Sequence, residues 1–204
     1  KFAGTLLFSP QDNFNTDALY PGKYTYQDDI TPERQAQVVM ENYDPSFASS
    51  IAQERARRAD NGEDAAVVLV SGYNFGTGSS REQAATALKY AGVPVVLAGS
   101  FSDVFKRNAI NNGLICLQCP ELVDDLTASY AKDGQRGAGG RQPGELSVLL
   151  RDATVSLNSR TGAVELRFGN GSVKHYTTRP AGIGRSIQEI YVAGGMESWV
   201  KQRL

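Results

Sequence analysis

The sequence predicts an α/β fold whose sheet is at least partly parallel and whose C-terminal part is rich in β-strands. Two strand–loop–helix units follow one another: an apolar run at 65–71 with a helix at 81–90, then an apolar run at 93–98 with a helix at 103–111. Such alternation is typical of parallel sheets with crossover helices. Beyond residue 144 the pattern changes to short strands separated by turns. Hydrophobic residues make up 41% of the chain, which is enough for a sizeable core.

The elements before these units are a strand and two helices. Residues 5–8 form a strand pattern and are followed by a loop rich in polar and aromatic residues. Thr31-Pro32-Glu33 has the pattern of an N-cap with proline at the first helical position, which predicts a helix to about Asn42. Asp44-Pro45 repeats this signal for a second helix, whose charged run at 54–58 is expected to be a solvated face.

After the second unit we expect a strand, a helix, a glycine-rich loop, three further strands and a terminal helix. The loop at 134–144 holds five glycines and a proline, which predicts a flexible insertion. It does not divide the chain, so we expect one domain, 1–204. The remaining predicted elements are the strand 114–117, the helix 120–132, the strands 153–157, 163–168 and 173–176, and the helix 196–203.

The charge balance and the apolar runs exclude two kinds of partner. The 21 basic and 22 acidic residues give a formal net charge of -1, so no global field favours nucleic acid or an anionic membrane. The longest apolar runs, at 65–70 and 93–98, are far too short to cross a bilayer. The chain begins at Lys1 and enters a strand pattern almost at once. We therefore expect a piece of a longer protein, in which a missing targeting segment says little about location.

The two cysteines, Cys116 and Cys119, form a C-x-x-C pattern at the end of an apolar strand. A zinc site would need a second pair of ligands, and a redox motif would open a helix. We therefore predict two reduced thiols in or near the core. Two cysteines alone also cannot hold a cubane iron–sulfur cluster, so we expect no metal ligands in this chain.

The segment that carries chemistry is the loop Gly72-Tyr-Asn-Phe-Gly-Thr-Gly-Ser-Ser-Arg-Glu82. Its glycines let backbone amides approach an anion, and the helix that follows adds unsatisfied N–H groups and the positive end of a dipole. Ser79 and Ser80 add hydroxyl donors, while Arg81 can bind a carboxylate with two parallel hydrogen bonds. The loop is therefore predicted to hold a carboxylate or a phosphate at the carboxyl end of the preceding strand, open to solvent.

Several sharper motifs are absent from this loop. It has no lysine for a Walker loop, Arg81 occupies the third glycine position of a dinucleotide fingerprint, and no Gly-x-Ser-x-Gly occurs. His175, the single histidine, lies in the β-rich part and is expected to be a solvated strand residue rather than a general base. The alternative for the loop is an ordinary glycine-rich turn with charges at a helix start.

Several segments together resemble the swivel domain of the aconitase and isopropylmalate isomerase family. That resemblance implies a β/β/α domain of the aconitase small-domain (LeuD-like) type. Gln83 and the loop 20–26 are most similar to the fungal homoaconitase branch of the family. The segments that carry the resemblance are Asn15-Thr-Asp17, Tyr20-Pro-Gly-Lys-Tyr-Thr-Tyr26, Asn74-Phe-Gly, Gly78-Ser-Ser-Arg-Glu82, Ser100-Phe-Ser-Asp-Val-Phe-Lys-Arg-Asn108, Asn112-Gly-Leu114, Gln188-Glu-Ile190 and Gly194-Gly-Met-Glu-Ser-Trp199.

The resemblance implies roles for particular residues. In this family a [4Fe-4S] cluster acts as a Lewis acid on the substrate hydroxyl, while a serine alkoxide removes a proton from the adjacent carbon. Carried onto this chain, Ser79 is the base, Ser80 donates a hydrogen bond to the substrate, and Arg81 binds a substrate carboxylate. Asp17 matches an active-site aspartate that orients a neighbouring group. An alkoxide needs nearby positive charge and amide donors, which agrees with this assignment.

This sequence departs from the family pattern in one place and lacks half of the family's site. Aconitases carry an arginine twelve positions after the aspartate, but Asp29 stands there in this chain. Lys23 is the nearest cation that could bind a second substrate carboxylate, although a surface lysine is an equal alternative. The cluster cysteines and catalytic histidines of the family lie in larger preceding domains. Those domains are the expected partner, and the isolated chain is expected to be inactive and to bind no cluster.

Three functions remain open from the sequence. The first is half of a hydro-lyase that interconverts homocitrate, homoaconitate and homoisocitrate in lysine biosynthesis, located in the mitochondrial matrix by resemblance to the fungal branch. The second is the small subunit or domain of a 3-isopropylmalate dehydratase-like enzyme of leucine biosynthesis. The third is a non-catalytic module that binds a carboxylate, against which the intact Ser79-Ser80-Arg81 argues.

Overall fold

The strands form one mixed sheet in which a parallel half and an antiparallel half share a central strand. The computed structural model describes residues 1–27, 29–63, 65–132 and 147–204. The strand order is β4-β3-β2-β1-β5-β6-β7, with β1 to β4 parallel and β5 to β7 antiparallel. The strands are β1 (Phe2–Ser9), β2 (Val67–Ser71), β3 (Val95–Ala98), β4 (Ile115–Gln118), β5 (Val148–Leu157), β6 (Ala163–Phe168) and β7 (Val173–Thr177).

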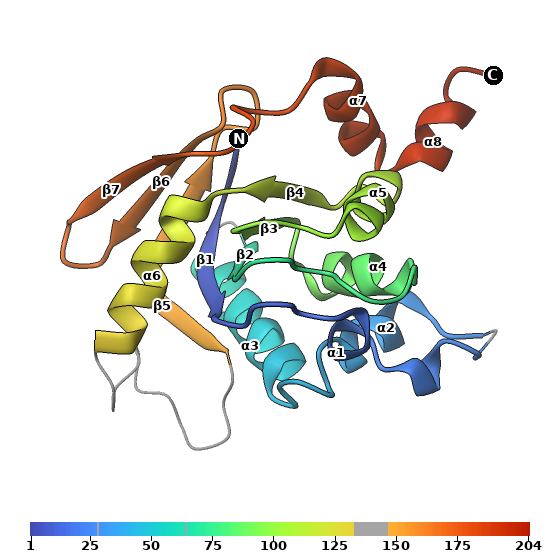
Figure 1. Cartoon of the computed structure of the whole chain (residues 1–204), viewed down its shortest axis with the longest axis horizontal. Helices are drawn as coiled ribbons and strands as arrows, with labels where there is room; N and C mark the ends of the chain where they lie inside the picture. The colour runs from blue at the N-terminus through green and yellow to red at the C-terminus, as the bar shows by residue number, and fades with distance from the viewer. Residues whose placement is uncertain (28, 64, 133–146) are drawn as a thin grey trace.

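Both faces of the parallel half are buried, as its continuous apolar runs predict. Successive side chains of a strand point to opposite faces: Leu7 belongs to one core cluster, while Leu6 and Phe8 belong to the other. Helices α2 (Pro32–Val38), α3 (Phe47–Asp60), α4 (Gln83–Ala91) and α5 (Asp103–Asn111) supply the first cluster. Helix α6 (Pro120–Lys132) and the inner residues of β5 and β6 supply the second (Figure 1). The sheet therefore separates two hydrophobic cores.

The two ends of the sheet curl toward each other. The backbone N–H of Arg179, just after β7, donates to the carbonyl of Gln118 at the end of β4 over 2.7 Å, and these residues form an isolated antiparallel bridge. The carbonyl of Thr177 lies 4.0 Å from Cys119 Sγ. The antiparallel half thus wraps around the second core.

Most of the predicted elements are confirmed, with shifted ends. Thr31 caps α2, because its Oγ1 accepts a hydrogen bond from the Arg34 N–H at 3.2 Å. The helix ends at Val38 rather than at Asn42, and Met40 soon after has a positive φ of 59°. Three short elements were not predicted, namely α1 (Thr16–Leu19), the 3₁₀ turn η1 (Gly22–Tyr24) and α7 (Arg185–Ala193). The predicted insertion at 134–144 lies outside the described residues.

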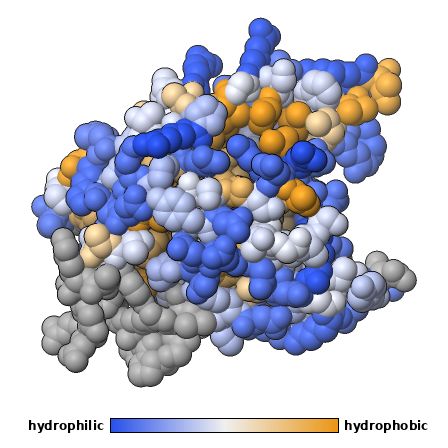
Figure 2. Space-filling view, in the orientation of Figure 1, coloured by the Kyte–Doolittle hydropathy of each residue, from blue (hydrophilic) through white to orange (hydrophobic). Residues whose placement is uncertain are grey.

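Helices α7 and α8 (Met196–Lys201) lie beside α5 (Figure 1). Figure 2 shows apolar side chains gathered over α7, where the Val192 side chain is 90% exposed. Much of the remaining surface in that view is polar. Within the described ranges, no helix combines the length and the apolar content that crossing a bilayer requires.

Lys89 on α4 joins three helices. Its Nζ donates to the carbonyl of Asn112, at the C-terminal end of α5, and to the carbonyl of Gly194, at that of α7, over 2.8 Å in each case. Carbonyls at helix C-termini carry partial negative charge, which favours a cation there. Burial lowers the pKa of Lys89, and the two carbonyls replace part of the water that its ammonium has lost.

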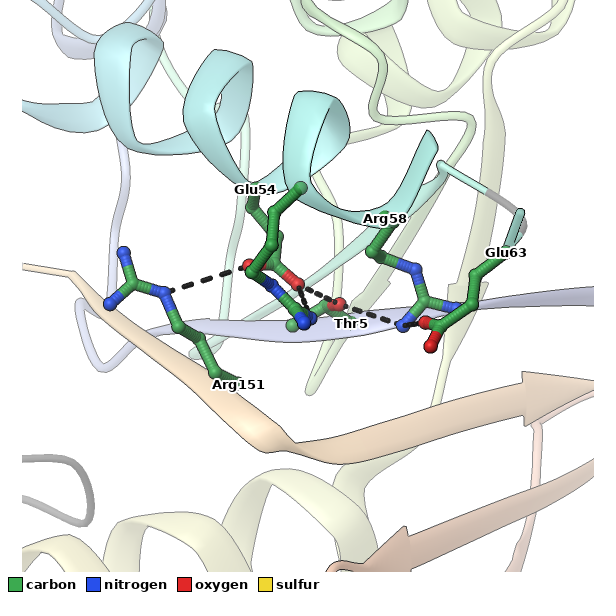
Figure 3. A network of polar contacts seen from close by, with 6 residues as sticks. Thr5, Glu54, Arg58, Glu63 and Arg151 are labelled. Carbon is green, nitrogen blue, oxygen red and sulfur yellow. Dashed lines mark hydrogen bonds and ion pairs between the residues drawn. The ribbon is translucent and has the colours of Figure 1, made fainter. Parts of the chain in front are cut away.

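The charged run on α3 is solvated only in part: residues 55–57 are exposed, as expected, but the ends of the run are buried. Glu54 is completely buried and Arg58 is buried as well. Figure 3 shows the reason: the Glu54 carboxylate points to the central strand, where Thr5 Oγ1 donates to its Oε1 over 2.7 Å. Arg57 donates to both carboxylate oxygens, at 2.7 and 2.9 Å, and Arg151 Nε on β5 lies 3.6 Å from Oε2. This network fastens α3 to both halves of the sheet.

Glu54→Gln is expected to lower the free energy of unfolding by about 2 kcal/mol at pH 7, because it removes the charged acceptor of the hydrogen bonds from Thr5 and Arg57. Burial disfavours the charged form of Glu54, but hydrogen bonds from Arg57 and Thr5 outweigh burial and lower its pKa. The stabilisation is therefore full above the ordinary carboxyl pKa of about 4.3 and is lost as pH falls through the lower folded pKa. Denaturant titrations at pH 7 and pH 3 measure both effects.

The matched control is Glu63→Gln. Glu63 lies at the solvent end of the same network, where its half-exposed carboxylate is 3.2 Å from Arg58 Nη1. Its loss should cost less than about 1 kcal/mol. Equal losses for the two variants would contradict a central role for Glu54.

Candidate active site

The parallel pairing of β1 and β2 brings two distant loops together. The two strands run in register up to Ser9 and Ser71, so their carboxyl ends lie at the same edge of the sheet. The loops that follow are joined by backbone hydrogen bonds from Gly76 N–H to the Phe14 carbonyl at 2.7 Å and from Thr16 N–H to the Thr77 carbonyl at 2.8 Å. Ligands of open α/β sheets bind at this edge.

Helix α1 places Thr16 against Ser79. Asn15 caps the helix, because its Oδ1 accepts a hydrogen bond from the Ala18 N–H at 2.8 Å. Thr16 is 2% exposed; its Oγ1 accepts a hydrogen bond from the Ser79 N–H at 3.0 Å and lies 2.9 Å from Ser79 Oγ. Gly78 has a φ of 100°, and a Cβ on it would lie 3.3 Å from Thr16 Oγ1. Glycine is therefore required here both for the backbone and for the close approach.

Asp17 binds and orients Arg81. The Arg81 Nη1 lies 2.5 Å from Asp17 Oδ1 and 3.1 Å from the carbonyl oxygen of Tyr20. Within the described parts of the chain, Nε and Nη2 of Arg81 have no hydrogen-bond partner. That leaves a two-donor edge of the guanidinium for a carboxylate. Gly22 borders this edge, since a Cβ on it would lie 3.1 Å from Asp17 Oδ1 and 3.4 Å from Arg81 Nη2.

Ser79 and Ser80 are exposed, as predicted for this loop. The Ser80 carbonyl accepts a hydrogen bond from Asn108 Nδ2 on α5 at 2.9 Å, which holds the loop from the other side. Helix α4 begins at Gln83, two residues after Arg81. The loop therefore combines exposed hydroxyls, an oriented guanidinium and the positive end of a helix dipole, a set of donors suited to an anion.

Lys23 lies in the same loop as Asp17, but an acidic side chain holds it. Its Nζ lies 2.6 Å from Glu41 Oε1, and the other carboxylate oxygen of Glu41 accepts a hydrogen bond from the Tyr24 hydroxyl at 2.9 Å. The hydrogen bond that Lys23 donates to Glu41 raises the pKa of Lys23. Asp29, which stands at the departure from the family pattern, is exposed. The structure gives Lys23 no contact with Ser79 or Arg81.

Three residues of the site were given no role from the sequence. Thr16 belongs to the family motif Asn15-Thr-Asp17, but only the pairing of the two loops shows that it contacts Ser79. Gly22 borders Arg81, and Glu41 neutralises Lys23. No short-range sequence signal marks these two residues, because Gly22 lies near Arg81 of the other loop and Glu41 pairs with Lys23 from a later turn of the chain.

The cysteines and the histidine lie where the sequence predicted. Cys116 and Cys119 are buried free thiols, and His175 is exposed on β7, separated from β1 by β5 and β6. Burial strongly raises the pKa of Cys116 and raises that of Cys119 to about 11. No group of three or more metal-ligating side chains occurs in the part of the chain that the structure describes. These residues do not fit an iron–sulfur cluster.

The fold and the joined loops define an α/β domain with exposed hydroxyls and an oriented guanidinium at the carboxyl edge of its parallel strands. The sequence profile of the aconitase C-terminal domain family matches residues 11–122, more than half of the chain. The chain belongs to this family, and the resemblance predicted from its motifs is confirmed.

Similar proteins agree with this membership. The chain is 59% identical over 208 residues to a mitochondrial homoaconitase of Mycosarcoma maydis and 52% identical over 206 residues to one of Cryptococcus neoformans var. neoformans serotype D. It is aligned over its whole length in both, and spans 28% of the length of each relative.

The structure of the 3-isopropylmalate dehydratase LeuD from Methanocaldococcus jannaschii has a TM-score of 0.65 and 29% identity to this chain. The match covers 98% of this chain and 93% of that one. The predicted LeuD-like fold class is therefore confirmed.

Both thiols are expected to resist alkylation in the native protein. With a pKa of about 11, the Cys119 thiolate should be scarce at pH 8. Iodoacetamide should then react at least about 100-fold more slowly than with free cysteine, and Cys116 should be slower still. Mass spectrometry of timed samples, with and without denaturant, measures both sites. Rapid native labelling of Cys116 would contradict its burial.

Proposed function

We propose that this chain is the substrate-closing domain of a mitochondrial homoaconitase. Such an enzyme is a hydro-lyase that interconverts homocitrate, homoaconitate and homoisocitrate in lysine biosynthesis. Family membership and relatives named as mitochondrial homoaconitases support this proposal. The observation that carries it is the meeting of Ser79 with the Asp17–Arg81 pair at one exposed edge of the sheet.

Ser79 is the proposed catalytic base. Its hydroxyl is exposed, so its Oγ can reach a proton on the substrate carbon next to the departing hydroxyl. Loss of the serine proton leaves a negative charge on Oγ, which nearby positive charge and N–H donors favour. Arg81 and the start of α4 supply such groups. A proton taken up by Oγ returns to carbon when the reaction runs in reverse.

Arg81 is the proposed carboxylate clamp, and Asp17 keeps it aimed. Because Nη1 is held by Asp17 and by the Tyr20 carbonyl, Nε and Nη2 can form two parallel hydrogen bonds with one substrate carboxylate. The Ser80 hydroxyl makes no hydrogen bond within the described residues and is available to the same substrate. Asp17 thereby contributes to catalysis through the orientation of Arg81.

The remainder of the enzyme is the proposed partner. The relatives are much longer than this chain, and the two cysteines of this chain are too few to hold a cubane cluster. We therefore assign the ligands of the [4Fe-4S] cluster, which supplies Lewis acidity to enzymes of this family, to the larger domains. The face with Ser79 and Arg81 is the one that must meet them.

An isopropylmalate dehydratase is the second candidate. The likeness to the Methanocaldococcus jannaschii enzyme favours it, since that match covers nearly all of both chains. Its 29% identity is about half the 59% shared with the Mycosarcoma maydis relative, which favours homoaconitase. Comparing kcat/KM for homoaconitate and isopropylmalate in the complete enzyme decides between them.

Ser79→Ala and Arg81→Lys are expected to fail differently in the complete enzyme. Loss of the Ser79 hydroxyl removes the proton acceptor, so kcat should fall about 10⁴-fold while KM changes little. Arg81→Lys keeps the charge but loses the paired donors, so KM should rise and kcat should fall. Steady-state kinetics on homoaconitate measure both. A Ser79→Ala enzyme with near-normal kcat would remove serine from the mechanism.

Lys23→Ala should change the preference among acids of different chain length if Lys23 binds the second carboxylate. Glu41→Gln is the matched variant, because it frees Lys23 from its ion pair while leaving the ammonium in place. The two variants should shift the ratio of kcat/KM for homoaconitate and cis-aconitate in opposite directions. If the ratio of kcat/KM values is unchanged in both variants, Lys23 is a surface residue that does not bind substrate.

A further inference from the structure

The contact between Thr16 and Ser79 constrains where the hydroxyl proton of Thr16 lies. Thr16 Oγ1 accepts a hydrogen bond from the Ser79 backbone N–H at 3.0 Å. Its second polar neighbour is Ser79 Oγ, at 2.9 Å. Among the residues that the structure describes, no third group is bonded to this hydroxyl.

The burial of Thr16 decides the direction of the second hydrogen bond. If Ser79 donated its proton to Thr16, the proton of Thr16 would be left without an acceptor in a side chain that is 2% exposed. A buried donor without a partner is costly. Ser79 is exposed, so its own proton can point to solvent or to a bound ligand. The arrangement that satisfies every group has Thr16 donating to Ser79.

We propose that Thr16 is a positioning residue that donates its hydroxyl proton to Ser79 Oγ and so stabilises the deprotonated form of this side chain. The inference rests on the proposed role of Ser79 as the base. When Ser79 loses its proton, its oxygen becomes a stronger acceptor and the hydrogen bond from Thr16 strengthens. The Ser79 N–H, held on the same Thr16 oxygen, fixes the geometry of the pair.

Two features of the surroundings keep Thr16 in this role. Gly78 leaves room for its oxygen, since an added Cβ would come within 3.3 Å of it. The Thr16 backbone N–H is bonded to the Thr77 carbonyl at 2.8 Å, which prevents α1 from moving away. A serine in place of Thr16 would keep the donor, whereas a valine would keep the shape and lose it.

The charged groups beside the pair are Asp17 on α1 and Arg81 at the end of the loop, and they bind each other. From α5, the side chain that contacts the loop is the neutral amide of Asn108. Glu82 follows Arg81 and is exposed. None of these groups changes when Thr16 is replaced, so a change in the pH dependence reports on the Thr16 hydroxyl.

The test is the pH profile of kcat/KM in the complete, cluster-loaded enzyme for Thr16→Val, Thr16→Ser and Ser79→Ala. Thr16→Val should lower kcat/KM about 10- to 100-fold at pH 7, the effect of losing a hydrogen bond to a charged group. The acidic limb of the profile should move by about one pH unit or more toward higher pH, because the base protonates more readily. Thr16→Ser should keep the wild-type limb.

The outcomes separate this inference from the proposed function. Near-normal activity of Ser79→Ala would show that Ser79 is not the catalytic base, and the proposed role of Thr16 would then be wrong as well. If Ser79→Ala is inactive but the acidic limb of Thr16→Val is unshifted, only the role of Thr16 is overturned. This holds however far kcat/KM falls in Thr16→Val. If Thr16→Val does not fold, Thr16→Cys replaces it: its weak donor should give a smaller shift in the same direction, and an unshifted limb would overturn the inference.

Discussion

The pairing of β1 with two different neighbours is the constraint on which the site depends. On one side β1 runs parallel to β2, so the two loops that leave their carboxyl ends emerge together. On its other side β1 runs antiparallel to β5, and the antiparallel half curls away around the second core. One strand therefore holds the site loops side by side and joins them to a scaffold built from the C-terminal part of the chain.

The buried carboxylate of Glu54 on α3 stabilises this arrangement of β1. Thr5 lies on the same strand that carries the first site loop, and it donates to the buried carboxylate of Glu54. Arg151 approaches that carboxylate from β5. The position of β1 between its neighbours is thus specified by polar contacts as well as by apolar packing, because a slipped register would move Thr5 away from Glu54.

The sequence predicts elements whose signals are local and misses those that depend on distant contacts. Thr31-Pro32 marks a helix start by itself, and the glycines of the loop at 72–78 mark a close approach of backbone wherever they occur. The burial of Glu54 could not be foreseen, because its partners Thr5 and Arg151 are far away in the chain. Helix α7 was missed because its N-cap residue is Gly184, which has no side chain to cap the helix. The family motif pointed to Ser79 and Arg81, whereas the contact between Thr16 and Ser79 follows only from the pairing of their loops.

Lys89 gives the domain a mechanical property. The N-terminal end of helix α4 directly follows the site loop. Asn108 of α5 donates a hydrogen bond to the Ser80 carbonyl of that loop. Near the other end of α4, Lys89 is fastened to the last turns of α5 and α7. Displacing the loop by itself would strain attachments at both ends of a single helix. Within this domain, the loop that carries Ser79 is therefore tied to α4, α5 and α7, and it is expected to move together with these helices rather than by itself.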